Sequence, residues 1–168
     1  MGYTIAICDD DKAMADKLTA SLKNEFMKAG RNDVIIDYYD TGVQLLEALK
    51  NKMYKAVLLD INMEPMDGFA VAEAIGKSGY RTKIIFVTSH EDVVYDTFDY
   101  TPFYFIRKSR YETYVQRVVK KLIAIDGYEK TIVIDDKDGI ININSGDITY
   151  VHSEDPVSYT HLTLPTNS

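Results

Sequence analysis

The segment AVLLDINMEPMDG, residues 56–68, joins a short apolar run to a carboxylate and then to a turn. The run at 56–60 is apolar without alternation, which is typical of a strand buried on both faces of a parallel sheet. Asp67, followed by Gly68, is a residue type that begins helices, and apolar residues at helical spacing follow it. The segment therefore predicts a strand and then a helix, with Asp60 at the carboxyl end of the strand.

The same alternation continues on both sides of this segment. Four more apolar runs indicate strands: YTIAIC (3–8), VIIDYY (34–39), KIIFVT (83–88) and FYFIRK (103–108). Helices are indicated between and after them by apolar spacing from Met14 to Phe26, by capping boxes at Thr41 with Gln44 and at Ser109 with Glu112, and by a short segment at 91–99. Strands that alternate with helices predict an α/β fold with a doubly wound, five-stranded parallel sheet, as in flavodoxin.

The composition narrows the class of protein. Lys+Arg 19 against Asp+Glu 26 gives a net charge of -7, which disfavours nucleic-acid binding by these residues. The single cysteine, Cys8, allows no intramolecular disulfide and fits a reducing compartment. No apolar run reaches the roughly 18 residues that a membrane span requires. We therefore expect a soluble, cytoplasmic protein with no membrane partner.

The character of the sequence changes after residue 127. Residues 131–155 contain short β-branched runs, a Lys-Asp-Gly turn and a Ser-Gly-Asp turn, which predict consecutive antiparallel strands. We expect a first domain at 1–125, a linker at 126–130 and only the opening of a second domain at 131–155, since an independent core usually needs at least about 40 residues. Residues 156–168 show no periodicity and resemble a translated adapter tail, so we expect them not to be native.

Carboxylates follow two of the expected strands at their carboxyl ends, where ligands bind in doubly wound sheets. Asp9 and Asp10 come directly after the first strand, and Asp60 ends the third. If these strands are neighbours, the three like charges repel one another unless a cation joins them. Hard oxygen ligands are those that Mg²⁺ prefers. The sequence therefore predicts a Mg²⁺ site at this edge of the sheet.

Two more polar residues at the same edge indicate the chemistry. Thr88 ends the fourth strand with a hydroxyl donor, and Lys108 ends the fifth with a positive charge. A metal ion, a lysine and a hydroxyl donor together are what the oxygens of a phosphoryl group require. An aspartate is also a competent nucleophile towards phosphorus. Asp60 is therefore predicted to carry a phosphoryl group.

Four motifs together resemble the receiver domain of two-component response regulators, over residues 1 to about 125. They are ICDDD (7–11), LLDINMEPMDG (58–68), FVTS (86–89) and FYFIRK (103–108). The resemblance implies a CheY-like receiver in which Asp60 is the phosphoacceptor. It also implies that Asp9 and Asp10 bind Mg²⁺ and that Asn62 contributes its backbone carbonyl to the ion.

The resemblance further implies a switch. Thr88 and Lys108 match the family's switch hydroxyl and lysine, and Phe105 matches the aromatic that turns inward when Thr88 moves to the phosphoryl group. PFYFIRKS (102–109) and the strand-rich residues after 130 resemble the AgrA/LytR branch, whose LytTR domain binds DNA. The partners implied are a sensor histidine kinase, DNA through the mostly missing second domain, and a second copy of the chain on phosphorylation.

Two positions depart from the family pattern, and two other functions stay open. Glu64, followed by Pro65, stands where the family usually has proline, and Ser109 replaces the proline that usually follows the lysine. The chain is alternatively a receiver that acts by protein contact without DNA, or a phosphohydrolase with an aspartate nucleophile. Such hydrolases usually carry a second acid two residues after the nucleophile, where this chain has Asn62. We therefore expect a signalling switch that only dephosphorylates itself, and not an enzyme.

Overall fold

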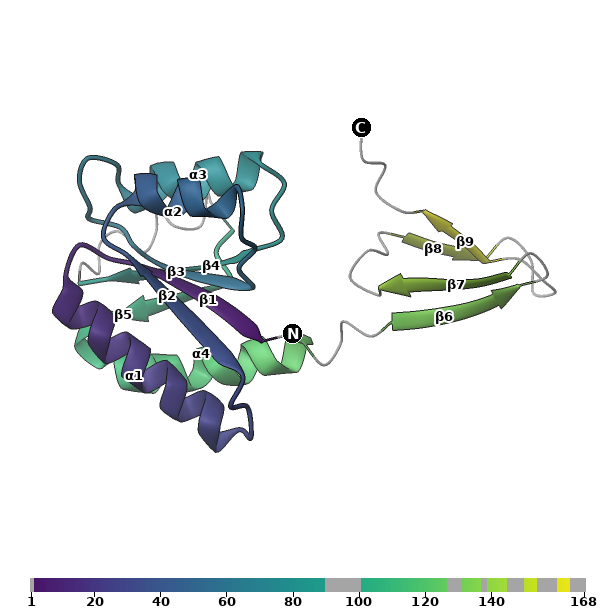
Figure 1. Cartoon of the computed structure of the whole chain (residues 1–168), viewed down its shortest axis with the longest axis horizontal. Coiled ribbons are helices and arrows are strands. Elements are labelled where there is room, and N and C mark those ends of the chain that lie inside the picture. The colour runs from purple at the N-terminus through teal and green to yellow at the C-terminus, as the bar shows by residue number, and fades with distance from the viewer. Residues whose placement is uncertain are drawn as a thin grey trace. The chain divides into compact units, whose positions relative to one another are not determined.

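A five-stranded parallel sheet forms the centre of the first part of the chain in the computed structural model of the protein (Figure 1). Its strands are β1 (Tyr3–Cys8), β2 (Val34–Tyr39), β3 (Ala56–Asp60), β4 (Lys83–Thr88) and β5 (Tyr104–Arg107). They lie in the order β2-β1-β3-β4-β5, so successive strands add first on one side of β1 and then on the other. The doubly wound α/β fold is therefore confirmed, with β5 one residue shorter at each end than the sequence predicted.

The structure describes residues 2–89 and 101–126, together with the backbone of four short strands between residues 131 and 163. The helix expected at 91–99 lies outside the described residues. The chain divides into two units, residues 1–119 and 120–168. Within the described residues, no helix has both the length and the apolar character that a membrane crossing demands.

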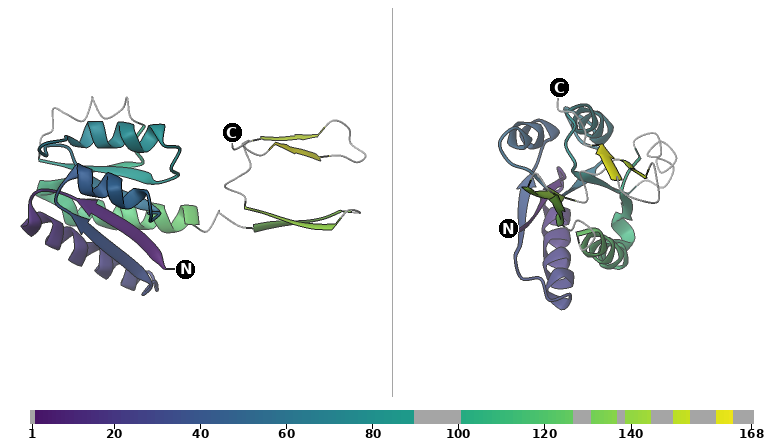
Figure 2. Two further views of the ribbon diagram at one scale, coloured as in Figure 1. Left: turned by 45° about the horizontal axis from the view of Figure 1, so that its top comes forward. Right: turned by 90° about the vertical axis from the view of Figure 1, so that its right-hand side faces the viewer.

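Helices cover both faces of the sheet. They are α1 (Lys12–Lys28), α2 (Gly42–Leu49), α3 (Gly68–Lys77) and α4 (Tyr111–Asp126). Figure 2 shows α2 and α3 over one face and α1 and α4 over the other. Because the side chains of a strand alternate between the two faces of the sheet, each strand in the middle of the sheet contributes to two separate cores.

Both cores consist of apolar side chains that water does not reach. On the α2 and α3 face, Cys8, Leu59 and Phe86 pack with helix residues such as Leu45 and Val71. The opposite face buries the predicted stripes of α1 and α4, namely Met14, Leu18, Leu22 and Phe26, and Val115, Val118, Val119 and Leu122. Each such side chain contributes about 1.5–3 kcal/mol to folding. The apolar spacing in the sequence therefore fixes which face of each helix meets the sheet.

Three helices begin at a residue whose side chain accepts a hydrogen bond from the backbone N–H three residues later. These bonds are Asp11 from Met14 (3.1 Å), Thr41 from Gln44 (3.3 Å) and Asp67 from Ala70 (2.8 Å). Each satisfies one of the N–H groups that the first helical turn leaves without a partner. The starts of α2 and α3 are those that the sequence predicts, and Asp11 places the start of α1 just before the predicted stripe from Met14 to Phe26.

The start of α4 differs from the prediction. Ser109 was expected to cap this helix with Glu112, but Ser109 lies inside a 3-10 turn, Lys108–Arg110, that follows β5 directly. Tyr111 then begins α4 with helical backbone angles. Because the turn joins strand to helix without an extended residue between Lys108 and Tyr111, Ser109 does not have the conformation of a helix cap.

The second unit contains two antiparallel pairs of strands. β6 (Thr131–Asp136) pairs with β7 (Gly139–Asn144), as the turn signal between them predicted. β8 (Tyr150–Ser153) pairs with β9 (Thr160–Thr163). β9 belongs to the segment 156–168, which shows no periodicity in the sequence and which we expect not to be native. Its non-native origin stays a prediction, as do the domain limits at 125 and 130.

Candidate functional site

Three carboxylates meet at the carboxyl edge of the sheet. In the β1–β3 pair, Cys8 is aligned with Leu59, so Asp9 and Asp60 follow on neighbouring strands. Asp9, Asp10 and Asp60 each place a carboxylate oxygen within 4.8 Å of the others. Asp9 is 1% exposed and Asp60 4% exposed, whereas Asp10 is open to solvent. The structure thus brings together the three acids that the sequence placed at this edge.

Lys108 joins the two buried acids. Its Nζ lies 2.9 Å from Asp9 Oδ2 and 3.3 Å from Asp60 Oδ2, and it donates a hydrogen bond to Asp9 Oδ1 at 3.1 Å. Burial lowers the pKa of Lys108, but its hydrogen bonds to Asp9 and its attraction to Asp60 outweigh this effect, so its pKa is raised above the usual value. The lysine therefore stays positively charged beside both carboxylates.

Asp60 is the acid whose environment disfavours its charge most clearly. Its pKa rises from 3.8 to about 6 because the carboxyl group is buried and because Asp9 repels it, while Lys108 acts in the opposite direction. One lysine thus offsets only part of the cost of placing two acids in a poorly solvated space. A further positive charge at this place would stabilise the ionised form of Asp60.

The ligand atoms fit a magnesium ion. Asp9 Oδ2 is buried and forms an ion pair with the Lys108 ammonium nitrogen at 2.9 Å, but it accepts no hydrogen bond of regular geometry from a described residue. A carboxylate oxygen has more than one lone pair, so this oxygen can also bind a metal ion. Two buried carboxylates together with the exposed Asp10 offer hard oxygen ligands and access for water, which Mg²⁺ retains when it binds.

The backbone around Asp9 is held by neighbouring residues. The Asp9 N–H donates to the Tyr39 carbonyl at 3.1 Å, and the Asp11 N–H donates to Asp9 Oδ1 at 2.9 Å. The Tyr38 hydroxyl donates to the Asp9 carbonyl at 3.0 Å. Tyr38 was not among the residues predicted from the sequence. Its position at the end of a strand was visible, but its contact with Asp9 depends on the order and register of the strands.

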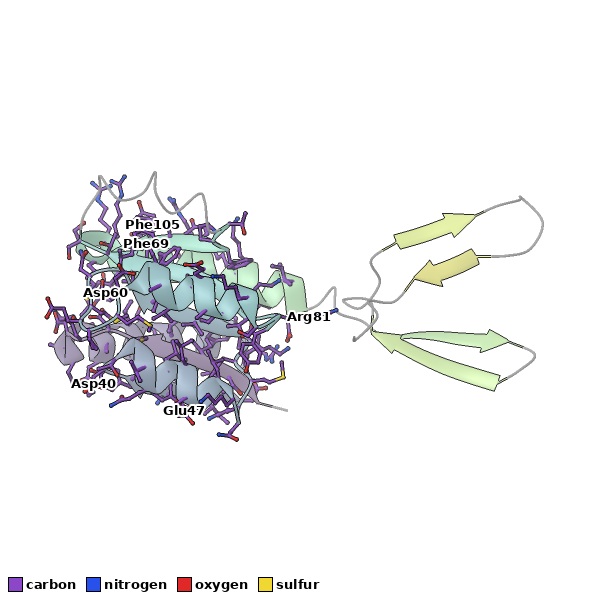
Figure 3. All side chains as sticks on the ribbon, turned by 90° about the horizontal axis from the view of Figure 1, so that it is seen from above. Asp40, Glu47, Asp60, Phe69, Arg81 and Phe105 are labelled. Carbon is purple, nitrogen blue, oxygen red and sulfur yellow. The ribbon has the colours of Figure 1, made fainter. Side chains whose placement is uncertain are left out.

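Thr88 and Phe105 lie on the strands beyond Asp60. Asp60 is aligned with Val87, so Thr88 comes one position further along β4, where it is 1% exposed. Phe105 is aligned with Phe86 and is partly buried against the core under α3. Figure 3 shows Asp60 and Arg81 towards opposite ends of this unit, as expected for the carboxyl and amino ends of its strands. The switching roles of Thr88 and Phe105 stay predictions.

The loop after Asp60 is anchored by buried methionine. Met63 is buried, and the Cys8 thiol donates to its sulfur at 3.7 Å. Burial and the neighbouring Asp9 raise the pKa of Cys8 to about 12, so the thiol stays protonated and serves as an apolar packing group. Asn62 is exposed in the same loop, and its carbonyl as a Mg²⁺ ligand stays a prediction. The Glu64–Pro65 peptide, where the sequence departs from the family pattern, is cis.

Gly68 allows α3 to begin directly against the backbone of Asp60. A Cβ atom at Gly68 would lie 2.2 Å from the Asp60 carbonyl oxygen and 2.9 Å from the Ile61 Cα atom. The Gly68 N–H also donates to the Ile61 carbonyl at 2.9 Å. The sequence indicated Gly68 only as part of a helix start. Its contact with Asp60 appears only in three dimensions.

We expect Gly68→Ala to lower the free energy of unfolding by about 1–3 kcal/mol, because the added methyl group has to displace backbone atoms. Gly76→Ala in the same helix is the matched control, since a Cβ there meets nothing within 4 Å. The control should be neutral or stabilising by about 0.5–1 kcal/mol. Urea unfolding of both variants measures the difference. Equal stability of the two variants would contradict the close packing at Gly68.

The fold and the acid cluster agree with the comparison to known families. The sequence profile of the response regulator receiver domain matches residues 5–120, so the chain belongs to this family. It contains the receiver of a two-component response regulator, a class whose receivers act as signalling switches.

Several named proteins are similar to the chain. The transcriptional regulatory protein YpdB of Escherichia coli K12 is 28% identical over 90 residues, which cover 54% of this chain and 37% of YpdB. Protein MrkE of Klebsiella pneumoniae is 27% identical over 88 residues, which cover 52% of this chain and 33% of MrkE. The chain therefore matches only about a third of the length of these relatives.

Solved structures show the same fold. The response regulatory domain of MrkE from Klebsiella pneumoniae has a TM-score of 0.65 at 22% identity, covering 73% of this chain and 96% of that domain. The response regulator TrrA from Thermotoga maritima, solved in complex with Mg(2+)-BeF, has a TM-score of 0.58 at 28% identity. That similarity covers 73% of this chain and 99% of TrrA.

Proposed function

We propose that Asp60 accepts a phosphoryl group from a sensor histidine kinase in a Mg²⁺-dependent reaction, and that this modification switches the receiver. The observation that carries the proposal is the position of Asp60, buried beside Asp9 and in contact with Lys108. The solved complex of TrrA with Mg(2+)-BeF, in a structure of the same fold, supports it. Phosphorylation would in turn regulate transcription through a C-terminal LytTR DNA-binding domain.

The chain's own residues suit such a transfer. A carboxylate oxygen of Asp60 forms a bond to phosphorus while the bond between phosphorus and the kinase histidine nitrogen breaks. Asp9 and Asp10 would hold the metal ion with Asp60, and Asn62 would add its backbone carbonyl. When bound, Mg²⁺ neutralises charge on the phosphoryl oxygens. Lys108 already lies against Asp60, so its ammonium group is available to the new phosphoryl oxygens.

The added charge provides the force for switching. The acyl phosphate carries close to two negative charges in place of the single charge of the Asp60 carboxylate, which is almost completely buried. Electrostatic attraction and hydrogen bonding to the phosphoryl oxygens favour movement of Lys108 and the Thr88 hydroxyl towards that charge. Phe105 would then fill the space that Thr88 leaves. A new surface around β5 then favours pairing with a second copy of the chain.

The proposal that the protein regulates transcription by binding DNA is supported by the named relatives and by the strands of the second unit. YpdB is named a transcriptional regulatory protein, and the chain covers only part of it. The antiparallel pair β6–β7 suits the opening of a LytTR domain.

The net charge of -7 favours the second candidate, a receiver that acts by protein contact alone. A phosphohydrolase is disfavoured because the exposed Asn62 offers no acid to protonate a leaving group.

Removal of the metal provides the test. With acetyl phosphate and MgCl₂, the intact mass of the chain should increase by one phosphoryl group. Excess EDTA should slow this reaction by about 100-fold, because a bound metal contributes several kcal/mol to stabilising the transferring group. Renewed addition of MgCl₂ should restore the rate. Equal labelling with and without EDTA would overturn the proposed role of the ion.

A further inference from the structure

Strand β2 holds the peptide groups on both sides of the Asp9 Cα atom. Tyr38 is aligned with Ile7, and its hydroxyl reaches along the edge of the sheet to donate to the Asp9 carbonyl at 3.0 Å. The next residue, Tyr39, accepts the Asp9 N–H at 3.1 Å. The carbonyl bound by Tyr38 belongs to the peptide that connects Asp9 to Asp10. Its orientation therefore affects the direction of both acids.

The Tyr38 ring is itself restrained. The Lys12 ammonium lies 4.8 Å from the ring centroid, in a cation–π contact. Lys12 is the first residue of α1, and Asp11, the cap of that helix, donates its N–H to Asp9 Oδ1.

We propose that Tyr38 is a positioning residue for the metal site, which holds the Asp9–Asp10 peptide so that both carboxylates face the ion. This inference rests on the proposed function, because it assumes that Mg²⁺ binds at the acid cluster. Groups that orient metal ligands without touching the ion contribute to affinity, since the ligands need not be ordered when the metal arrives. The hydroxyl of Tyr38 is such a group, whereas its ring alone is not.

The test is a calorimetric titration of the full chain with MgCl₂. Tyr38→Phe should weaken Mg²⁺ binding by about threefold to tenfold, the value of one oriented hydrogen bond near a metal site. Tyr39→Phe is the matched control: it removes a hydroxyl from the adjacent residue of the same strand, but that hydroxyl bonds to Tyr54 at 2.5 Å and not to Asp9. The control should bind Mg²⁺ as the unchanged chain does, even if both variants lose similar thermal stability.

A kinetic measurement separates positioning from a general loss of structure. The MgCl₂ concentration that gives half the maximal rate of labelling by acetyl phosphate should rise by the same factor in Tyr38→Phe, while the rate at saturating MgCl₂ stays unchanged. If Tyr38→Phe does not fold, Tyr38→Leu, which also lacks the hydroxyl, takes its place. If the variant without the Tyr38 hydroxyl binds Mg²⁺ as tightly as the chain without substitutions does, the assignment of Tyr38 is refuted, but the proposed function is not. If the chain without substitutions binds no Mg²⁺, the proposed function itself is refuted.

Discussion

Asp60→Asn is expected to abolish labelling of the chain by acetyl phosphate. The amide has nearly the shape of the carboxylate, so packing against the loop is kept, but it has no anionic oxygen to attack phosphorus. Intact mass spectrometry should show one added phosphoryl group on the unchanged chain and none on the variant. The effect should be a complete loss and not a partial one, because the neighbouring Asp9 and Asp10 are proposed to hold the metal ion and not to attack phosphorus.

Asp67→Asn is the control for this experiment. Asp67 lies in the same loop and caps α3 by accepting the Ala70 N–H at 2.8 Å, and asparagine caps helices equally well. Asp67→Asn should therefore be labelled as the unchanged chain is. Labelling of Asp60→Asn that equals the control would show that another residue carries the phosphoryl group.

The same Asp60→Asn change is expected to stabilise the metal-free chain at alkaline pH. The pKa of Asp60 is raised from 3.8 to about 6, so the stability associated with this group is fully present below 3.8 and is lost as the pH rises through about 6. A shift of about two pKa units corresponds to about 3 kcal/mol. The neutral amide does not lose this stability, so the variant should exceed the unchanged chain by up to about 3 kcal/mol near pH 8.

Urea unfolding in EDTA measures this difference. The advantage of Asp60→Asn should fall to about 1 kcal/mol near pH 4.5, where the unchanged Asp60 is mostly protonated. Asp67→Asn should change the free energy of unfolding by no more than about 0.5 kcal/mol at either pH. An advantage of Asp60→Asn that is constant with pH, or a loss of stability near pH 8, would contradict the unfavourable charge of the buried carboxyl group.

Most of the fold follows from local signals in the sequence. Apolar runs such as 34–39 and 83–88 became strands with the same bounds, and Thr41 and Asp67 became helix caps. These features depend on side-chain periodicity and on hydrogen bonds within a few residues. The predicted start of α4 was wrong because Ser109 lies in a 3-10 turn, and the path of the chain after β5 decides whether this residue can have the extended backbone of a cap.

The sequence was enough to predict which acids and which lysine lie together, but not which neighbouring residues hold them in place. Asp60 ends a strand, and Asp9 and Lys108 directly follow two other strands, so the rule for doubly wound sheets was enough to predict that they lie at one edge. The contact of Gly68 with Asp60 and the bond from Tyr38 to Asp9 depend on the register of strands and on the approach of a helix. Tyr38 lies 29 residues from Asp9 in the chain, and the nearer pair of Gly68 and Asp60 meets only because of the path of the loop between them, so no local pattern encodes either contact.

The central claim is that the acids at the carboxyl edge of the sheet hold a divalent ion beside the phosphorylated residue. Crystals of the full chain soaked with MnCl₂, measured at the manganese absorption edge, test it most directly. The account predicts an anomalous peak at roughly 2.0–2.2 Å from oxygens of Asp9, Asp10 and Asp60, the range of octahedral ions of this type. An anomalous map with no peak among these three carboxylates, or with manganese bound only elsewhere on the chain, would contradict it.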